Sequence, residues 1–155
     1  MTITVDTSVF IELLLDQDRA EESESLLDAI ARGRLDAVVS HFAIHAIESM
    51  IATPQKLSTF LNDVETSKGL TVYETTISDE QSASILSARI GLDFDDSIQY
   101  YVARKTDSSA IISFDKHFDR CGIPRREPVQ VLKDLAEEDE PKKQKGDPQQ
   151  VKSAE

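Results

Sequence analysis

The chain is poor in cysteine: its 155 residues include only one, Cys121. A single cysteine excludes a disulfide within the chain and fits the reducing cytoplasm, where thiols stay free. Cys121 could act as a nucleophile, but nothing in its sequence context supports an activated thiol. We therefore expect a packed thiol in a cytoplasmic protein.

Long apolar runs are also missing. No stretch approaches the roughly 20 consecutive apolar residues that a membrane-spanning helix needs. The first residues, Met1–Asp6, have neither the basic region nor the cleavage-site pattern of a signal peptide. We therefore expect no signal peptide and no role at a membrane.

Basic residues are scarce relative to acidic ones: 17 lysines and arginines accompany 29 aspartates and glutamates, which gives a net charge of −12. This balance opposes non-specific binding to bare nucleic acid, because the phosphates are repelled at long range. It leaves open a basic partner, adaptation to high salt, or simple solubility. A nucleic-acid substrate held through metal ions and a local basic patch also stays open.

One such basic patch lies within residues 116–126, where the only acid is Asp119. Its members are Lys116, Arg120, Arg125 and Arg126. A solvated loop and a phosphate-binding surface explain this patch equally well.

The chain does contain enough apolar sequence for one domain, with 39% hydrophobic and 30% charged residues. Beyond Leu135 the sequence turns charged and loses its apolar periodicity. We therefore predict a domain over residues 1–135 and a charged, disordered tail over residues 136–155. For the tail, a solvating extension is favoured over a binding segment.

Short apolar segments alternate with helical patterns along that domain. Strands are predicted at 2–5, 36–40, 70–73 and 110–114, with amphipathic helices between them. This alternation predicts an α/β fold with a central, mainly parallel sheet of about four to five strands flanked by helices. Residues 129–135 fit either a short strand or a last helical turn.

Polar residues mark where the helices begin. Thr7 or Ser8 can cap the first helix, and Ser40 can cap the helix after the second strand. Residues 78–81, Ser-Asp-Glu-Gln, fit a capping box that opens a later helix. Asp96 is expected to open the helix that follows it.

Four carboxylates occupy positions that this fold would bring together. Asp6 and Asp115 directly follow apolar strands, and ligands bind beyond the carboxyl ends of parallel strands. Glu48 shares a helical stripe with isoleucines at positions 44, 47 and 51, where an unpaired charge is costly. Carboxylates gathered in this way repel one another, so we expect a divalent cation between them.

Each carboxylate also has a simpler explanation. Asp6, Asp115 and one of the acids at positions 93–96 could be helix N-caps. Glu48 could lie at the edge of its stripe and reach water or an arginine.

The ligand types indicate a hard metal. His41 and His45 lie four residues apart on one predicted helix, but no third nitrogen or sulfur ligand is near in sequence, so we favour surface histidines. The chain has no phosphate-binding glycine motif and no G-x-S-x-G nucleophile motif. Oxygen ligands favour Mg²⁺, with Mn²⁺ as an alternative.

Four segments together resemble the PIN-domain nucleases, and most of all the VapC-type toxins of bacterial and archaeal toxin–antitoxin modules. In chain order they are Val5–Phe10, Glu48, Asp95–Ile98 and Ser113–Asp119. The resemblance covers about residues 1–135; each segment alone is unspecific, whereas the ordered set is fairly specific. Ser97 departs from the alanine that is usual in relatives.

The resemblance implies a catalytic, metal-binding quartet of Asp6, Glu48, Asp96 and Asp115, supported by Thr7, Ser113 and Asp119. It implies Mg²⁺-dependent hydrolysis of RNA phosphodiester bonds, often in a structured RNA such as tRNA. It also implies a homodimer and an antitoxin that silences the enzyme. The basic patch directly follows Asp115 and is our candidate for holding the RNA backbone.

Two other functions are weighed against this one. A haloacid-dehalogenase-like phosphatase also places an aspartate after its first strand, but it requires a second aspartate where this chain has Ser8. A non-catalytic PIN-like binding module would be favoured by an altered quartet, and all four acids are present here.

Overall fold

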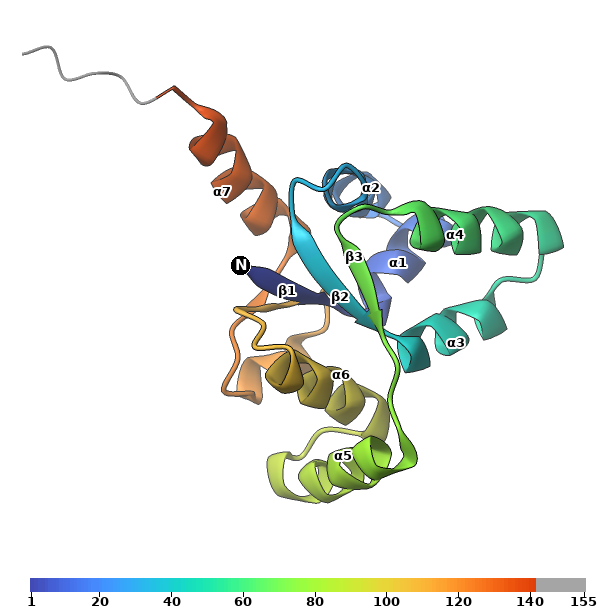
Figure 1. Ribbon diagram of the computed structural model, residues 1–155, viewed down its shortest axis with the longest axis vertical. Helices are drawn as coiled ribbons and strands as arrows, with labels where there is room; N and C mark the ends of the chain where they lie inside the picture. The colour runs from blue at the N-terminus through green and yellow to red at the C-terminus, as the bar shows by residue number, and fades with distance from the viewer. Residues whose placement is uncertain (142–155) are drawn as a thin grey trace, which may run out of the picture.

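A parallel β-sheet forms the centre of the molecule in the computed structural model, which describes residues 1–141 (Figure 1). Within that range the sheet has five strands in the order β3-β2-β1-β4-β5, and every neighbouring pair is parallel. The strands are β1 (Thr2–Val5), β2 (Asp36–Ser40), β3 (Leu70–Tyr73), β4 (Ile111–Ile112) and β5 (Arg125–Arg126). The expected α/β fold is confirmed, although β4 is shorter than the predicted 110–114.

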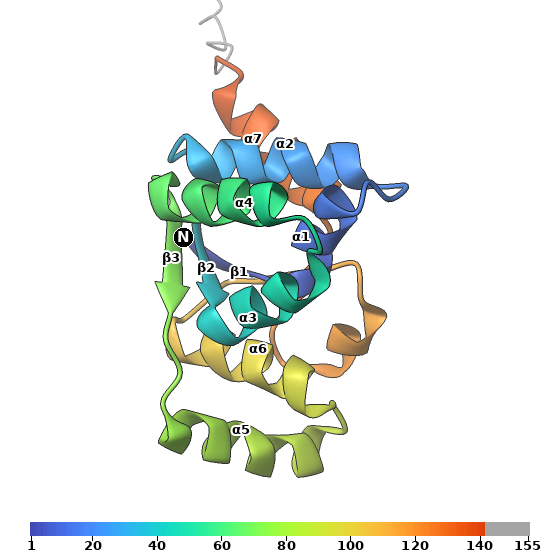
Figure 2. The same cartoon turned by 90° about the vertical axis from the view of Figure 1, so that its right-hand side faces the viewer.

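Helices cover both faces of the sheet. The helices before β3 are α1 (Thr7–Leu14), α2 (Ala20–Ala31), α3 (His41–Met50) and α4 (Pro54–Thr66). After β3 come α5 (Ile77–Ile90), α6 (Phe94–Lys105), the short 3-10 helix η1 (Lys116–Arg120) and α7 (Pro128–Asp139). Figure 2 shows α2 and α4 on one side of the sheet and α5 and α6 on the other.

The two-residue period of the strands separates two regions of the core. In β2, Val39 packs with the helices α1–α4, whereas Val38 packs with α5 and α6. In β4, Ile112 joins the first group and Ile111 lies on the opposite face, beside Phe118. Because both faces are covered, the inner strands β2, β1 and β4 are buried along most of their length, as expected for a parallel sheet.

Three predicted helix starts are wrong by a few residues. Asp6 caps α1 by accepting a hydrogen bond from the Ser8 amide, so the simpler explanation for Asp6 holds and neither Thr7 nor Ser8 is the cap. Thr76 caps α5 and forms its capping box with Asp79, two residues before the predicted cap Ser78. Asp93 caps α6 and accepts from the Asp96 amide, so Asp96 lies within the first turn. Ser40 caps α3 as predicted.

The segment after η1 resolves the ambiguity at residues 129–135. Arg125–Arg126 form the edge strand β5, and residues 129–135 belong to α7, which begins at Pro128. This helix continues to Asp139, so residues 136–139 are helical, contrary to the prediction of disorder. The rest of the predicted tail, 142–155, lies outside the described residues. Among residues 1–141, no helix has the length and apolar character required to cross a bilayer.

Candidate metal centre

Asp6 lies at the carboxyl end of the central strand, next to Ser113. Val5 of β1 pairs with Ile112 of β4, and the Asp6 amide donates to the Ile112 carbonyl at 2.9 Å. This register places the two following residues side by side, and the Ser113 hydroxyl donates to Asp6 Oδ2 at 2.7 Å. The sheet itself therefore positions the Asp6 carboxylate.

A second hydroxyl extends this network. Ser8 Oγ lies 3.2 Å from Ser113 Oγ and accepts a hydrogen bond from the Phe114 amide, also at 3.2 Å. Because Ser113 gives its one hydroxyl proton to Asp6, Ser8 is the donor between the two serines. Ser8, rather than the predicted Thr7, supplies the supporting hydroxyl, while the Thr7 amide bonds Asp6 through the backbone.

Burial makes the Asp6 carboxylate costly to ionise. The residue is only 6% exposed, and burial raises the pKa of its carboxyl group above the ordinary value of 3.8. Hydrogen bonds from Ser113 and Ser8 lower the same pKa but do not cancel the effect of burial. A cation beside this oxygen would favour the ionised form.

Asp96 comes to the same place from α6. Its side chain is 13% exposed, and its pKa is raised to about 7, first by burial and then by the charges of Asp93, Asp6 and Asp115. Asp6 and Asp115 thus both act electrostatically on Asp96. The sequence predicted this repulsion between neighbouring carboxylates.

Asp115 completes the group. Its amide donates to Ser113 Oγ at 2.9 Å, and its carboxylate caps η1 by accepting from the His117 amide at 2.9 Å. One donor atom from each of Asp96, Asp115 and His117 lies within 4.8 Å of the others. Ser113 therefore contacts both strand-end aspartates, and the structure brings Asp6, Asp96 and Asp115 together.

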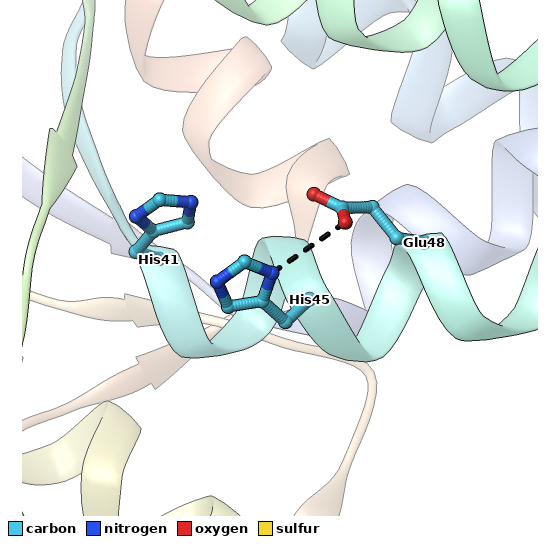
Figure 3. Close-up of side chains that lie close together, drawn as sticks. All are labelled: His41, His45 and Glu48. Atoms are coloured by element: carbon cyan, nitrogen blue, oxygen red, sulfur yellow. Dashed lines mark hydrogen bonds and ion pairs between the residues drawn. The ribbon is translucent and has the colours of Figure 1, made fainter.

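Glu48 does not join this group in the structure. Its side chain is 32% exposed, and Oε2 lies 3.5 Å from Nδ1 of His45 on the same helix (Figure 3). At about 100° per residue, Glu48 lies roughly 100° around the helix from Ile47 and only at the margin of the isoleucine stripe. The prediction that Glu48 faces the core was wrong, and the simpler explanation, an edge position that reaches water, is correct.

The sequence missed His117 as a neighbour of the acids. Its Nδ1 lies 3.0 Å from Asp115 Oδ1 and 3.5 Å from Asp96 Oδ2. The available signal was its position two residues after a predicted ligand, within the segment that resembles the family. Asp119, expected to support the site, instead pairs with Arg125 Nε at 2.7 Å.

The four predicted RNA-binding residues divide into two pairs. Arg125 is 12% exposed, and its guanidinium bonds Asp119, Glu127 and the Ser113 carbonyl; Arg126 pairs with Asp134. Lys116 and Arg120 are exposed. Arg120 lines a hollow of about 270 Å³ together with Asp93, Asp96 and His117.

The donor set fits a hard divalent cation. Three carboxylates come together at the carboxyl end of the sheet. Asp6 is buried, and the pKa of Asp96 is raised by burial and by the neighbouring acids. Cys121 adds no soft ligand to this group; it packs beside Phe118, and burial raises the pKa of its thiol. This packing agrees with the expectation of an inert thiol.

Comparisons with known proteins agree with the geometry. A family model described as the PIN domain matches residues 2–117. None of the curated proteins matches the chain.

Solved structures of toxin–antitoxin proteins share the fold. The Mycobacterium tuberculosis toxin VapC20, described as cleaving the sarcin–ricin loop, has a TM-score of 0.65 at 19% identity, covering 78% of this chain and 95% of its own. A toxin–antitoxin complex from Klebsiella pneumoniae has a TM-score of 0.62 at 16% identity, covering 81% and 97%. VapBC2 from Rickettsia felis, bound to a promoter DNA fragment, has a TM-score of 0.59 at 10% identity, covering 82% and 98%.

Proposed function

The chain belongs to the PIN domain family, and from this premise we propose that it is a metal-dependent endoribonuclease, the toxin of a toxin–antitoxin pair. The observation that carries the proposal is the convergence of Asp6, Asp96 and Asp115 at the carboxyl end of the parallel sheet. Burial raises the pKa of Asp96, and the charges of Asp93, Asp6 and Asp115 raise it further. This is the arrangement expected of ligands that share a cation.

Asp6, Asp96 and Asp115 are the residues that would hold Mg²⁺, or Mn²⁺ in its place. Glu48 is proposed as the fourth acid, by family resemblance. When bound, the ion polarises the phosphodiester, lowers the pKa of a water molecule and stabilises the leaving oxygen.

The protein residues contribute orientation and charge. Ser113 and Ser8 hold the Asp6 carboxylate in one position, and Ser113 also fixes the backbone of Asp115. Arg125, with its guanidinium on the Ser113 carbonyl, acts as a positioning residue for the same segment. Of the predicted phosphate-binding residues, Lys116 and Arg120 keep exposed cationic groups near the acids, so we assign RNA binding to these two.

The substrate class is proposed as structured RNA, with tRNA as the first candidate. Support comes from the toxin VapC20, which shares this fold and is described as cleaving the sarcin–ricin loop. The net charge of −12 disfavours long-range attraction of RNA in general. Recognition therefore depends on the local cations and on the metal centre.

A cognate antitoxin is the proposed partner, in the cytoplasm and with the toxin as a homodimer. A groove of about 460 Å³ between α1, α2 and α4 offers a contact surface. Leu13, Leu27 and Phe60 line it, and Glu24 and Asp63 lie at its acidic margin. An apolar helix with basic flanks complements this groove, whereas a second copy of this acidic chain does not.

Neither alternative function is favoured by the structure. Family membership and the serine at position 8 set aside the dehalogenase-like phosphatase. A binding module without catalysis has no need for a half-buried acid, Asp96, whose pKa is raised by burial and then by the charges of neighbouring acids.

RNA cleavage by the purified chain tests the proposal. We expect cleavage of tRNA or of a structured RNA with Mg²⁺ or Mn²⁺, and none in excess EDTA. Cleavage that persists in EDTA would refute the metal-nuclease proposal. Co-purification with the product of an adjacent short reading frame tests the antitoxin assignment.

A further inference from the structure

The surface of α3 carries a second group of possible metal ligands, of which the proposed nuclease centre uses only Glu48. His41 and His45 lie one turn apart, and Glu48 follows on the same helix (Figure 3). One donor atom from each of these three residues lies within 4.8 Å of the others. We infer that His41, His45 and Glu48 form a binding site for a transition-metal ion of the Zn²⁺ class.

The helix backbone already fixes the spacing that such a site needs. Residues four apart on a helix face the same side, which is how paired histidines bind zinc in helical motifs. The two imidazole rings stack with their centroids 4.3 Å apart and an interplanar angle of 18°. Figure 3 shows the Glu48 carboxylate turned back along the helix toward His45.

The distances suit a small ion. Zinc binds nitrogen and carboxylate oxygen at about 2.0–2.2 Å, so tetrahedral ligands lie about 3.3–3.5 Å from one another. His45 Nδ1 and Glu48 Oε2 are 3.5 Å apart, which meets this requirement without movement. The His41 donor atom lies within 4.8 Å of the other two, so rotation of its side chain would bring it to the ion without a change of the helix backbone.

Ligand type distinguishes this site from the acidic centre. Imidazole nitrogen prefers Zn²⁺, Ni²⁺ or Cu²⁺, whereas carboxylate oxygen alone suits Mg²⁺. His45 is 65% exposed, so an ion enters from solvent and a water molecule completes its coordination. Surface histidines without a third ligand were favoured from the sequence; the structure supplies that ligand as an oxygen, from Glu48.

Glu48 then belongs to two sites, and this consequence rests on the proposed function. If Glu48 serves the Mg²⁺ centre, it cannot also bind an ion held by the two histidines. Transition-metal binding on α3 would therefore slow RNA cleavage by withdrawing one acid from the nuclease centre.

Isothermal titration calorimetry of Zn²⁺ into the full chain, in excess Mg²⁺, tests whether α3 binds the ion. The protein must carry no polyhistidine tag. The chain has three histidines, so His117→Gln, beside the acidic centre, is a matched control for His41→Gln and His45→Gln. Since loss of even an outer-shell partner costs about 10–100-fold in metal affinity, loss of a ligand should weaken binding at least about tenfold.

We expect a Zn²⁺-binding event that weakens in His41→Gln, in His45→Gln and in Glu48→Gln, and that persists in His117→Gln. Equal isotherms for wild type and His45→Gln would overturn the site. Loss of Zn²⁺ binding in His117→Gln alone would also overturn the α3 site, because the ion would then bind beside Asp96 and Asp115. Circular dichroism of each variant verifies the fold, which substitution of the exposed His45 should not alter.

A separate assay tests the sharing of Glu48. Zn²⁺ added to the Mg²⁺-dependent reaction should lower the cleavage rate of wild type but not that of His45→Gln, each compared with its own rate without Zn²⁺. Equal inhibition of both proteins would contradict the sharing. If no RNA is cleaved under any condition, the proposed function fails while the calorimetric result still decides the zinc site.

Discussion

Asp96 shows how a single ionisable group in the proposed metal centre makes stability depend on pH. Its pKa is raised from 3.8 to about 7 in the folded protein. Between these two values the folded state binds more protons than the unfolded state, so stability falls as pH rises through this range. Below pH 4 the group is protonated in both states and contributes nothing to the difference.

We therefore predict that Asp96→Asn stabilises the metal-free protein at pH 8 and loses this advantage at pH 4. Thermal unfolding at both pH values in EDTA measures the effect. Asp95→Asn, an exposed neighbour in the same helical turn, is the control and should change little. An equal gain from Asp96→Asn at both pH values would contradict the assigned pKa.

Glu48 shows a different balance between stability and function. Its carboxylate is partly exposed, so Glu48→Gln should change the free energy of unfolding by no more than about 0.5 kcal/mol. The same substitution should abolish Mg²⁺-dependent RNA cleavage if Glu48 is the fourth acid. Urea unfolding and a cleavage assay on one preparation separate the two effects; a large loss of stability would identify a structural role instead.

At the scale of elements, α6 contains a buried hydroxyl without a hydrogen-bond partner among the described residues. Ser97 is fully buried, and its Oγ has no such partner. An unsatisfied buried hydroxyl costs about 1–3 kcal/mol. Its neighbour Asp96 faces the metal centre, while Ser97 faces the helix-covered interior.

Ser97→Ala should therefore stabilise the protein by about 1 kcal/mol, which corresponds to roughly 2–4 °C in melting temperature for a chain of this size. The buried hydroxyl of Ser23 in α2 also lacks a hydrogen-bond partner among the described residues, so Ser23→Ala should raise the melting temperature as well. Differential scanning calorimetry measures both. A lower melting temperature for Ser97→Ala would reveal a hydrogen bond that the hydroxyl makes.

The elements were largely predictable from sequence because strand and helix periods differ. Val38 and Val39 alternate between opposite faces, and the segments between strands repeat at helical spacing. Helix starts were harder to predict, because several residues near each start can cap: Asp6 competes with the hydroxyls of Thr7 and Ser8, and Asp93 competes with Asp96. Here the acids cap the helices and also face the metal centre.

The site was predictable only in part, for a related reason. Strand register brings Asp6 beside Ser113, and parallel pairing alone predicts that proximity. The spacing of residues along a helix does not determine where a long side chain at the margin of an apolar stripe points. The prediction that Glu48 faces the core was therefore wrong. The pairing of Arg125 with Asp119 depends on how η1 folds back on β5, which periodicity does not reveal.

At the scale of the whole molecule, the acidic charge sets how RNA can bind. The net charge is −12, and exposed cations near the metal centre are Lys116 and Arg120. Each phosphate neutralised by a cation contributes about 0.7 to the slope of log affinity against log salt for single strands. A shallow salt dependence is therefore expected, in contrast to a basic nucleic-acid-binding protein.

Lys116→Gln and Arg120→Gln should each weaken RNA binding and reduce the magnitude of that slope by about one phosphate contact. Arg126→Gln is the matched control, because its guanidinium already pairs with Asp134. Binding of uncleaved RNA in Ca²⁺ or EDTA across a salt series measures the slopes. A larger effect from Arg126→Gln would assign RNA recognition to β5 instead.

The most direct test of the proposed metal-dependent ribonuclease is RNA cleavage by Asp6→Asn in Mg²⁺. Asp6 is chosen because it is the most buried of the converging acids. Asp36→Asn, an exposed aspartate at the opposite end of the parallel sheet, controls for the substitution itself. We expect Asp6→Asn to fold, to melt no lower than wild type without metal and to cleave no RNA, while Asp36→Asn cleaves at the wild-type rate. Robust Mg²⁺-dependent cleavage by Asp6→Asn would contradict this proposal.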